Sequence, residues 1–370
     1  MYEKKYLNDI LRKGENYLDL FRLLAASLVI IGHSYSISPQ PPYSDGIASL
    51  LKFDYSGSLS VKFFFFLSGM LVTNSIMAKP DGFSFLLKRA VRIYPGLFVC
   101  VLVAVFVVGP VFTTLPLHQY FRTRETWTYL SSNFFIFHLQ WRLPGVFASH
   151  ADGLNGSLWT LSYEMTFYIY LAIFHGLGLL RNKRVANVFY IAMMILPYAA
   201  PQVLPLFLMN IDHARAFTTY FAFGCFCATN KQLIDIQLPK AILLWCLAYI
   251  LNDSNGYPFF FYFALFYTIF YLASLPAVRR LRLPFDASYG VYIYGFIVQH
   301  CLVAVWPHLG VHGNQWLGIA IALSLGILSW YFVEKPFIEL GNRLATRPFL
   351  SWFKNPRRAD NSADSVRAKL

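Results

Sequence analysis

An apolar run of helix length near the N-terminus contains strongly polar side chains. Residues Tyr17 to Ser38 read YLDLFRLLAASLVIIGHSYSIS, and a bilayer is crossed by about 20 predominantly apolar residues. The run also holds Arg22 and His33, although ionisable groups inside a span are costly and usually functional. Their separation corresponds to three helical turns plus ~20°, so they share a face about 16 Å apart along the axis. We therefore expect one elongated ligand to contact both side chains.

The composition predicts an all-α fold, a polytopic transmembrane helical bundle. The chain has 370 residues, of which 57% are hydrophobic and only 13% are charged. Several apolar runs reach the length of a membrane span, and no polar stretch is long enough to build a second core. We expect residues 1–340 to form one integral-membrane domain and residues 341–370 a basic cytoplasmic tail. The ten predicted spans cover residues 17–38, 57–78, 90–112, 157–180, 186–200, 213–230, 239–252, 257–276, 287–307 and 315–335.

The distribution of basic residues predicts which side of the membrane each connection occupies. Lys and Arg cluster in short segments such as Arg181–Arg184 and Arg279–Arg282, and in the C-terminal tail. Cytoplasmic loops carry such an excess, so both termini should be cytoplasmic and residues 145–155 should lie outside. The apolar segment 127–139 should then be an outer-surface or re-entrant helix. The net charge of +13 is explained by this pattern and by membrane lipids, without a nucleic-acid partner.

Two side chains in the predicted outer leaflet could carry acid–base chemistry. His33 lies about 24 Å along its helix, and an imidazole with a pKa near ~6.5 can act as a general base. Glu164 follows a Gly-rich outer loop and should lie at a similar depth on another helix. A carboxylate that accepts the second N–H of an imidazole fixes its tautomer and supports the imidazolium form. The alternative is a buried pair that only joins two helices.

Two arginines open the third predicted span from the cytoplasmic side. Arg89 and Arg92 are three residues apart and therefore share a helix face. A helix N-terminus that carries two guanidinium groups is a suitable phosphate site. The alternative is ordinary anchoring of the span by basic residues at the lipid headgroups.

Further polar side chains lie inside predicted spans. Ser68 and Gly69 fall near the middle of their span, where Gly permits close helix approach and Ser can bond across helices. Tyr292 and Gln299 lie at helical spacings and could line a cavity, whereas an interfacial aromatic belt is the alternative. The histidines show no metal-ligand spacing, so no metal site is expected.

Together these segments resemble the acyltransferase-3 family of membrane acyltransferases, from Leu18 to about Phe337. The motifs that carry the resemblance are LDLFRLLAASLVIIGH with Arg22 and His33, FFFFLSGML with Ser68, RAVRIYP with Arg89, Arg92 and Pro95, LWTLSYEMTFY with Trp159 and Glu164, SYGVYIY, and FVEKPF. Two positions depart from the family pattern, because Gly295 stands where many members have a histidine and Met165 replaces a second acidic residue.

The resemblance implies transfer of an acyl group, most simply acetyl, from cytoplasmic acyl-CoA to a sugar hydroxyl. The acceptor would be an envelope or exported polysaccharide, lipid-linked or in transit, and the enzyme would lie in a bacterial inner membrane. Acyl-CoA would be a co-substrate and no permanently bound cofactor is implied.

We therefore expect the functional groups to divide into three sets. His33 is the expected general base and Glu164 the group that orients it. Arg22, Arg89, Arg92 and Ser68 are expected to bind the donor, and Trp159, Tyr163, Tyr292 and Gln299 the acceptor. A polytopic transporter or exporter of an anionic or glycan substrate is the alternative, because it would also use intramembrane Arg and His.

Overall fold

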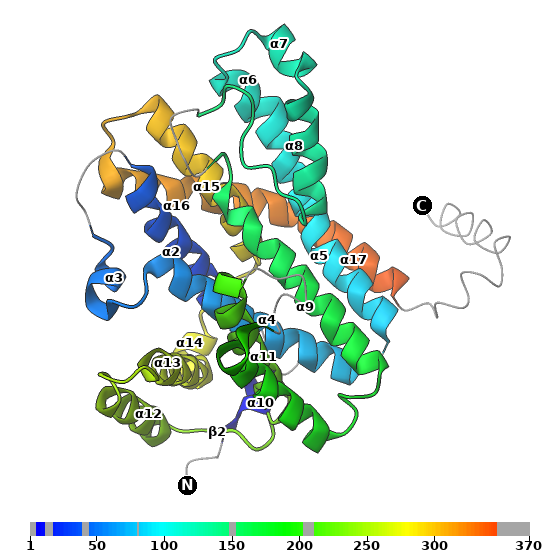
Figure 1. Cartoon of the computed structure of the whole chain (residues 1–370), viewed down its shortest axis with the longest axis vertical. Helices are drawn as coiled ribbons and strands as arrows, with labels where there is room; N and C mark the ends of the chain where they lie inside the picture. The colour runs from blue at the N-terminus through cyan, green and yellow to red at the C-terminus, as the bar shows by residue number, and fades with distance from the viewer. Residues whose placement is uncertain are drawn as a thin grey trace, which may run out of the picture.

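The computed structural model is a bundle of helices and describes residues 5–11, 18–38, 44–79, 81–147, 153–202 and 211–345 (Figure 1). Two of the elements below, η1 and η4, are π-helical turns and η2 is a 3₁₀ turn. In chain order the elements are β1 (Lys5–Tyr6), α1 (Leu7–Ile10), α2 (Asp19–Ile37), α3 (Gly46–Leu51), α4 (Ser56–Ala78), α5 (Gly82–Val103), η1 (Ala104–Val108), α6 (Gly109–Phe112), α7 (Leu117–Arg122), α8 (Arg124–Phe135), η2 (Gly156–Leu158), α9 (Trp159–Gly176), α10 (Lys183–Ala199), α11 (Ile211–Thr229), β2 (Asp235–Ile236), α12 (Leu238–Ile250), α13 (Tyr257–Ser274), α14 (Pro276–Arg279), α15 (Ser288–Val305), α16 (Gly310–Ser329), η4 (Trp330–Glu334) and α17 (Lys335–Leu344).

Each of the ten predicted spans coincides with a helix, so the all-α class is confirmed. Within the described part of the chain, six helical stretches are long and apolar enough to cross a membrane. The six stretches are Asp19–Ile37, Ser56–Ala78, Gly82–Phe112, Tyr257–Ser274, Ser288–Val305 and Gly310–Leu344. The chain is thus a multi-pass membrane protein, whereas ten crossings and the side of each terminus remain predictions.

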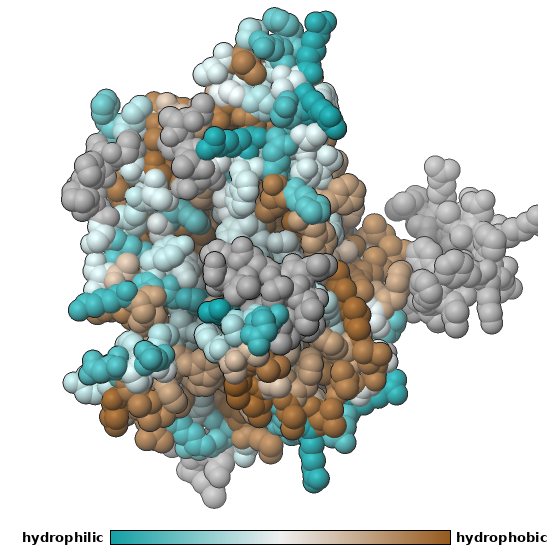
Figure 2. Space-filling view, in the orientation of Figure 1, coloured by the Kyte–Doolittle hydropathy of each residue, from teal (hydrophilic) through white to brown (hydrophobic). Residues whose placement is uncertain are grey.

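The surface of the bundle fits this assignment. Figure 2 shows hydrophobic residues gathered over α10 and its neighbours, and hydrophilic residues more frequent at the end formed by α7 and α8. On α10, Val188 is 68% exposed and Ile195 is 56% exposed. Exposed aliphatic side chains in such a row suit contact with lipid rather than water.

The arginines of α5 do not lie at a helix N-terminus, contrary to the sequence-based expectation. Asp81 is the N-cap, and its Oδ1 accepts a hydrogen bond from the backbone N–H of Phe83 at 3.2 Å, while Ser84 Oγ donates to its other oxygen. An Asp in this position satisfies backbone donors that a helix start leaves open. The helix therefore begins before the predicted boundary, and Arg89 and Arg92 lie in later turns. The N-terminus of this helix and the two arginines therefore do not form one phosphate site together.

Helices α4 and α11 form the closest helix pair of the bundle interior. A Cβ atom on Gly69 would lie 2.1 Å from the carbonyl oxygen of Phe221, and one on Gly224 would lie 2.1 Å from that of Phe66. Neither glycine can be replaced without separating the helices. The expectation that Gly69 permits close helix approach is confirmed. Helix α4 lies at the centre of the bundle.

The N-terminal segment is attached to the connection between α11 and α12. Strands β1 and β2 pair antiparallel, with Lys5 opposite Ile236 and Tyr6 opposite Asp235. The two segments therefore lie at the same end of the bundle. This agrees with their shared assignment to the cytoplasm from their basic residues.

The segment predicted as an outer or re-entrant helix at 127–139 contains α8, which packs against α5. The residues that directly follow it are held in place by Gln140, whose Nε2 donates to the carbonyl oxygens of Glu125 and Arg142 at 2.8 and 2.9 Å. Asn133 Nδ2 in turn donates to the carbonyl oxygen of Gln140 at 3.0 Å. Helix α8 and the described residues up to Arg142 are thus joined by hydrogen bonds.

Cysteine labelling should place α7 and the start of α10 on opposite sides of the membrane. Ser149, the natural site for such a test, lies outside the described residues, whereas Gln119 on α7 and Lys183 on α10 are both exposed. In intact cells a membrane-impermeant maleimide should label Gln119→Cys, but should label Lys183→Cys only after permeabilisation, because of the basic cluster around Lys183. Labelling of both from one side would show that the connection contains a different number of crossings.

Candidate active site

A deep cavity inside the bundle gathers most of the predicted site residues. Its empty space, including the mouth, is about 1470 Å³, and it is enclosed by α2, α4, α5, α9, α15 and the last helical stretch. Along α9, Thr160 lies about two turns before Tyr168, which is close enough to Arg89 to interact with it electrostatically, so Thr160 and Arg89 lie at different levels of the cavity. The predicted residues that line it are Arg22, Ser68, Arg89, Arg92, Glu164 and Tyr292.

Two of the cavity's arginines share one carboxylate that the sequence analysis did not select. Arg22 Nη1 lies 2.7 Å from Asp286 Oδ2, and Arg92 Nη2 pairs with the same oxygen. Asp19 Oδ1 lies 3.3 Å from Arg22, and Ser288 Oγ donates to Asp286 Oδ1 at 2.8 Å. Burial alone would raise the pKa of Asp286, but the charges of Arg22 and Arg92 outweigh it and hold that pKa well below its ordinary value. Asp286 therefore stays ionised and joins α2, α5 and α15.

Arg89 differs from the other two arginines. Its guanidinium lies over the ring of Phe85, and its Nε is buried without a hydrogen-bond partner among the described residues. It is close enough to Tyr168 and Glu164 to interact with both electrostatically. Guanidinium groups present five donors in a planar fork that fits phosphate. Among the described residues, Arg89 is thus the one of the three arginines with no carboxylate at ion-pair distance, so its positive charge is available to an anion.

Glu164 lies in the same cavity, beside the hydroxyl groups of a tyrosine and a serine. Tyr168 Oη donates to its Oε1, and Ser68 Oγ lies 3.4 Å from that oxygen. Ser68 Oγ and Tyr168 Oη are themselves 2.8 Å apart. Tyr168 was not predicted, although it is four residues after Glu164 and so lies on the same face of α9. This arrangement sets the carboxylate among the arginines of the cavity.

His33 lies on the other side of Tyr292 from the arginines and is not among the residues that line this cavity. Its ring packs edge-on against Phe296, with ring centroids 4.9 Å apart and planes at 79°. Phe296 also fills the space beside Gly156, whose Cβ would lie 2.7 Å from the ring. Helices α2 and α15 and the start of α9 therefore meet at His33. A direct contact between His33 and Glu164 remains a prediction.

The remaining predicted residues lie around the cavity rather than in its lining. Trp159 and Tyr163 pack at right angles to each other and both contact Phe217 of α11. Gln299 is fully buried, and its Nε2 donates at 2.8 Å to the carbonyl oxygen of Ile30 and to Asn314 Oδ1. Gln299 thus ties α15 to α2 and α16.

The histidine that many family members carry has no room in this chain. A Cβ atom on Gly295 would lie 2.7 Å from Ile30 Cγ1. The side chain of Ile30 on α2 fills the position instead, so α2 and α15 approach more closely than a histidine would permit.

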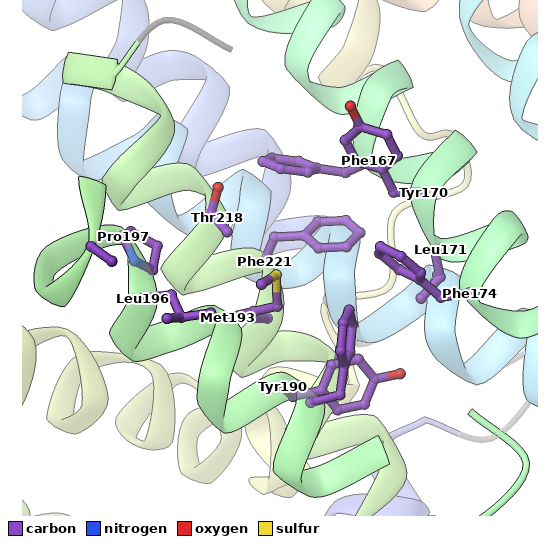
Figure 3. A pocket seen from close by; sticks show the side chains of 14 residues that line it. Phe167, Tyr170, Leu171, Phe174, Tyr190, Met193, Leu196, Pro197, Thr218 and Phe221 are labelled. Carbon is purple, nitrogen blue, oxygen red and sulfur yellow. The ribbon is translucent and has the colours of Figure 1, made fainter. Parts of the chain in front are cut away.

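A second cavity, of about 680 Å³, lies between α9, α10 and α11 (Figure 3). Its described lining consists of aromatic and aliphatic side chains with a few hydroxyl and thiol groups, and contains no charged residue. Phe167, Phe174, Met193 and Phe221 project into it. Among the described residues, this lining offers no charged group that could bind an anion.

Removal of the Asp286 carboxylate should destabilise the protein. In Asp286→Ala, Arg22 and Arg92 lose their shared counter-charge inside the bundle, and breaking a buried pair costs roughly 3–5 kcal/mol. The midpoint of thermal unfolding in detergent, followed by fluorescence-detected size exclusion, should fall clearly. Asp253→Ala, which removes an exposed loop carboxylate, should leave it unchanged. Equal midpoints for the two variants would show that the arginines are compensated in another way.

Comparison with known proteins agrees with this architecture. The sequence profile of the acyltransferase domain matches residues 15–334. The chain is 28% identical over 333 residues to an "O-acetyl transferase" of Shigella phage Sf6, which covers 87% of this chain and 96% of that protein. It is also 28% identical over 366 residues to "Nodulation protein 10" of Rhizobium leguminosarum bv. viciae, covering 90% of this chain and 95% of that protein. No solved structure gives a significant match. The match over most of the chain shows that this protein belongs to the acyltransferase-3 family of acyltransferases.

Proposed function

We propose that this chain is an acyl-CoA-dependent O-acetyltransferase of the bacterial inner membrane. Its donor would be cytoplasmic acetyl-CoA, and its acceptor a sugar hydroxyl of an envelope or exported polysaccharide. The name of the phage relative supports the acetyl group. The observation that carries the proposal is the arginine-lined cavity, in which the charge of Arg89 is available to a phosphate while Arg22 and Arg92 are shared with Asp286.

The donor is proposed to enter at the end of the cavity where Lys88 and Arg89 lie. A polyanion arriving there would meet the basic side chains of Lys88 and Arg89, which both line the cavity. The narrow pantetheine arm would continue past Ser68 toward Tyr292. The nucleotide would thus stay at the basic end and the thioester would reach the far end.

The proposed chemistry needs one base and balances without a cofactor. The acceptor hydroxyl oxygen attacks the thioester carbonyl carbon, while His33 takes the hydroxyl proton. The carbon–sulfur bond then breaks, and the leaving thiolate receives the proton as free CoA. Trp159 and Tyr163 are proposed to contact the acceptor sugar, since aromatic rings suit its apolar faces. Gln299 would act by fixing α15, because its amide nitrogen is used within the bundle.

The base is tested by His33→Ala. Purified protein in nanodiscs should transfer acetyl from radiolabelled acetyl-CoA to polysaccharide from the host strain, whereas the variant should be about 10²–10⁴-fold slower. Binding of acetyl-CoA should be nearly unchanged, because His33 lies outside the cavity that is proposed to hold the donor. Turnover of His33→Ala at the wild-type rate would exclude it as the base. Export of unmodified glycan without any acetyl transfer would favour the alternative function, a transporter of glycans.

Donor binding is tested by comparing arginines. Arg89→Ala should weaken acetyl-CoA binding, measured by isothermal titration calorimetry, about ten- to a hundredfold, because one charged hydrogen bond contributes roughly 1.5–3 kcal/mol. Arg89→Lys should restore only part of the affinity, since an ammonium group cannot bind phosphate bidentately. Arg92→Ala should weaken binding less, because its guanidinium already pairs with Asp286.

Arg184→Ala, which removes an exposed arginine of α10, is the matched control and should bind as wild type. The effect of Arg89→Ala should shrink with acetyl-pantetheine, which lacks the nucleotide phosphates. Wild-type affinity in Arg89→Ala would place the donor phosphates elsewhere.

A further inference from the structure

Two hydrogen-bonded hydroxyl groups lie in the cavity at a different level from Arg89. Thr160 lies in the first turn of α9 and Tyr292 in the second turn of α15, and both line the cavity. Thr160 Oγ1 and Tyr292 Oη are 2.6 Å apart. The residues are only 5% and 8% exposed, respectively. Such a pair can serve a ligand in the cavity only if a proton remains to be donated.

Counting protons shows that one remains. Each hydroxyl group has one proton and two acceptor lone pairs, so the bond between Thr160 and Tyr292 uses one of two protons. The other recorded contact of the Thr160 hydroxyl is the carbonyl oxygen of Ser157, at 3.4 Å. That distance exceeds the usual 2.5–3.0 Å of an O–H···O hydrogen bond. Whichever oxygen donates within the pair, the second proton can be directed into the cavity.

The pair is also placed between the arginines and the proposed base. Phe296 follows Tyr292 by four residues, which is about one turn of α15, and His33 packs on Phe296. Phe64 packs edge-on against Tyr292, with centroids 5.8 Å apart, and limits the movement of its ring. A thioester that reached this pair would therefore lie about one turn of α15 away from Phe296, on which His33 packs.

We propose that Tyr292 Oη donates a hydrogen bond to Thr160 Oγ1, and that the Thr160 hydroxyl in turn donates one to the carbonyl oxygen of the donor's thioester. This inference rests on the proposed acetyl-CoA chemistry. When the acceptor oxygen bonds to the carbonyl carbon, the π electrons move onto that carbonyl oxygen, and the Thr160 proton stabilises the negative charge. The electrons return as the carbon–sulfur bond breaks. Thr160 is then a catalytic residue and Tyr292 a positioning residue, and positioned donors of this kind raise kcat more than affinity.

The test removes the hydroxyl while keeping the shape of the side chain. Thr160→Val should lower kcat about 10²-fold, as expected for loss of one donor to a developing oxyanion, with the Kd for acetyl-CoA unchanged. Thr160→Ser keeps the hydroxyl and should stay within a few-fold of wild type. Thr166→Val is the matched control, because Thr166 lies on the same helix and donates to Ser162 at 2.7 Å, outside the cavity lining.

The role of Tyr292 is tested by a double-mutant cycle. Tyr292→Phe should lower kcat by a smaller factor, and the Thr160→Val/Tyr292→Phe double variant should be no slower than Thr160→Val, since both act through one hydrogen bond. Wild-type kcat in Thr160→Val, or an equal loss in Thr166→Val, would overturn the inference while leaving the proposed function intact. Absence of acetyl transfer by the wild-type protein would instead overturn the proposed function and this inference with it.

Discussion

The ion pairs around Asp286 are the interaction on which the interior of this bundle depends. A single carboxylate holds guanidinium groups from α2 and α5 at the start of α15. Unpaired charges inside a protein are strongly unfavourable, so the shared carboxylate stabilises Arg22 and Arg92 in this apolar bundle. The same contact fixes three helices around the cavity. The same cluster of charged side chains therefore contributes both to the stability of the protein and to the shape of the cavity.

The cluster also explains why the cavity's arginines are not equivalent. Asp286 neutralises part of the charge of Arg22 and Arg92, whereas Tyr168 and Glu164 interact with Arg89 electrostatically without an ion pair among the described residues. A phosphate that enters the cavity gains most from the cation whose donors are not already used. The two arginines of RAVRIYP thus differ: Arg92 is paired with Asp286, and Arg89 is the arginine proposed to bind the donor.

The sequence allowed the helices to be predicted well, because a long apolar run has few alternatives to a helix. All ten segments were found, and α8 also appeared where an additional helix was expected. The contact of Tyr168 with Glu164 was not predicted, although their spacing of four residues within one helix could have indicated it. Boundaries set by a cap were missed at α5, since Asp81 moved the start of the helix outward. Partners between helices were missed most often. Nothing in the spacing of Arg22, Arg92 and Asp286 along the chain indicates that they meet, because helix packing decides it.

Helix α15 positions three groups of site residues at successive turns along its length. Ser288, Tyr292 and Phe296 follow one another at single-turn intervals, and they contact Asp286, Thr160 and His33 in that order. The helix can hold these positions because it is packed closely on its neighbours: a Cβ atom on Gly290 would lie 2.6 Å from the Cα of Gly326 in α16. Helix α2 carries Arg22 beside Asp286 and His33 beside Phe296, so its polar residues lie at the first and third of these positions. Under the proposed function, the phosphates of the donor would lie near the charged groups, the thioester near the hydroxyl groups, and the acceptor hydroxyl near the imidazole.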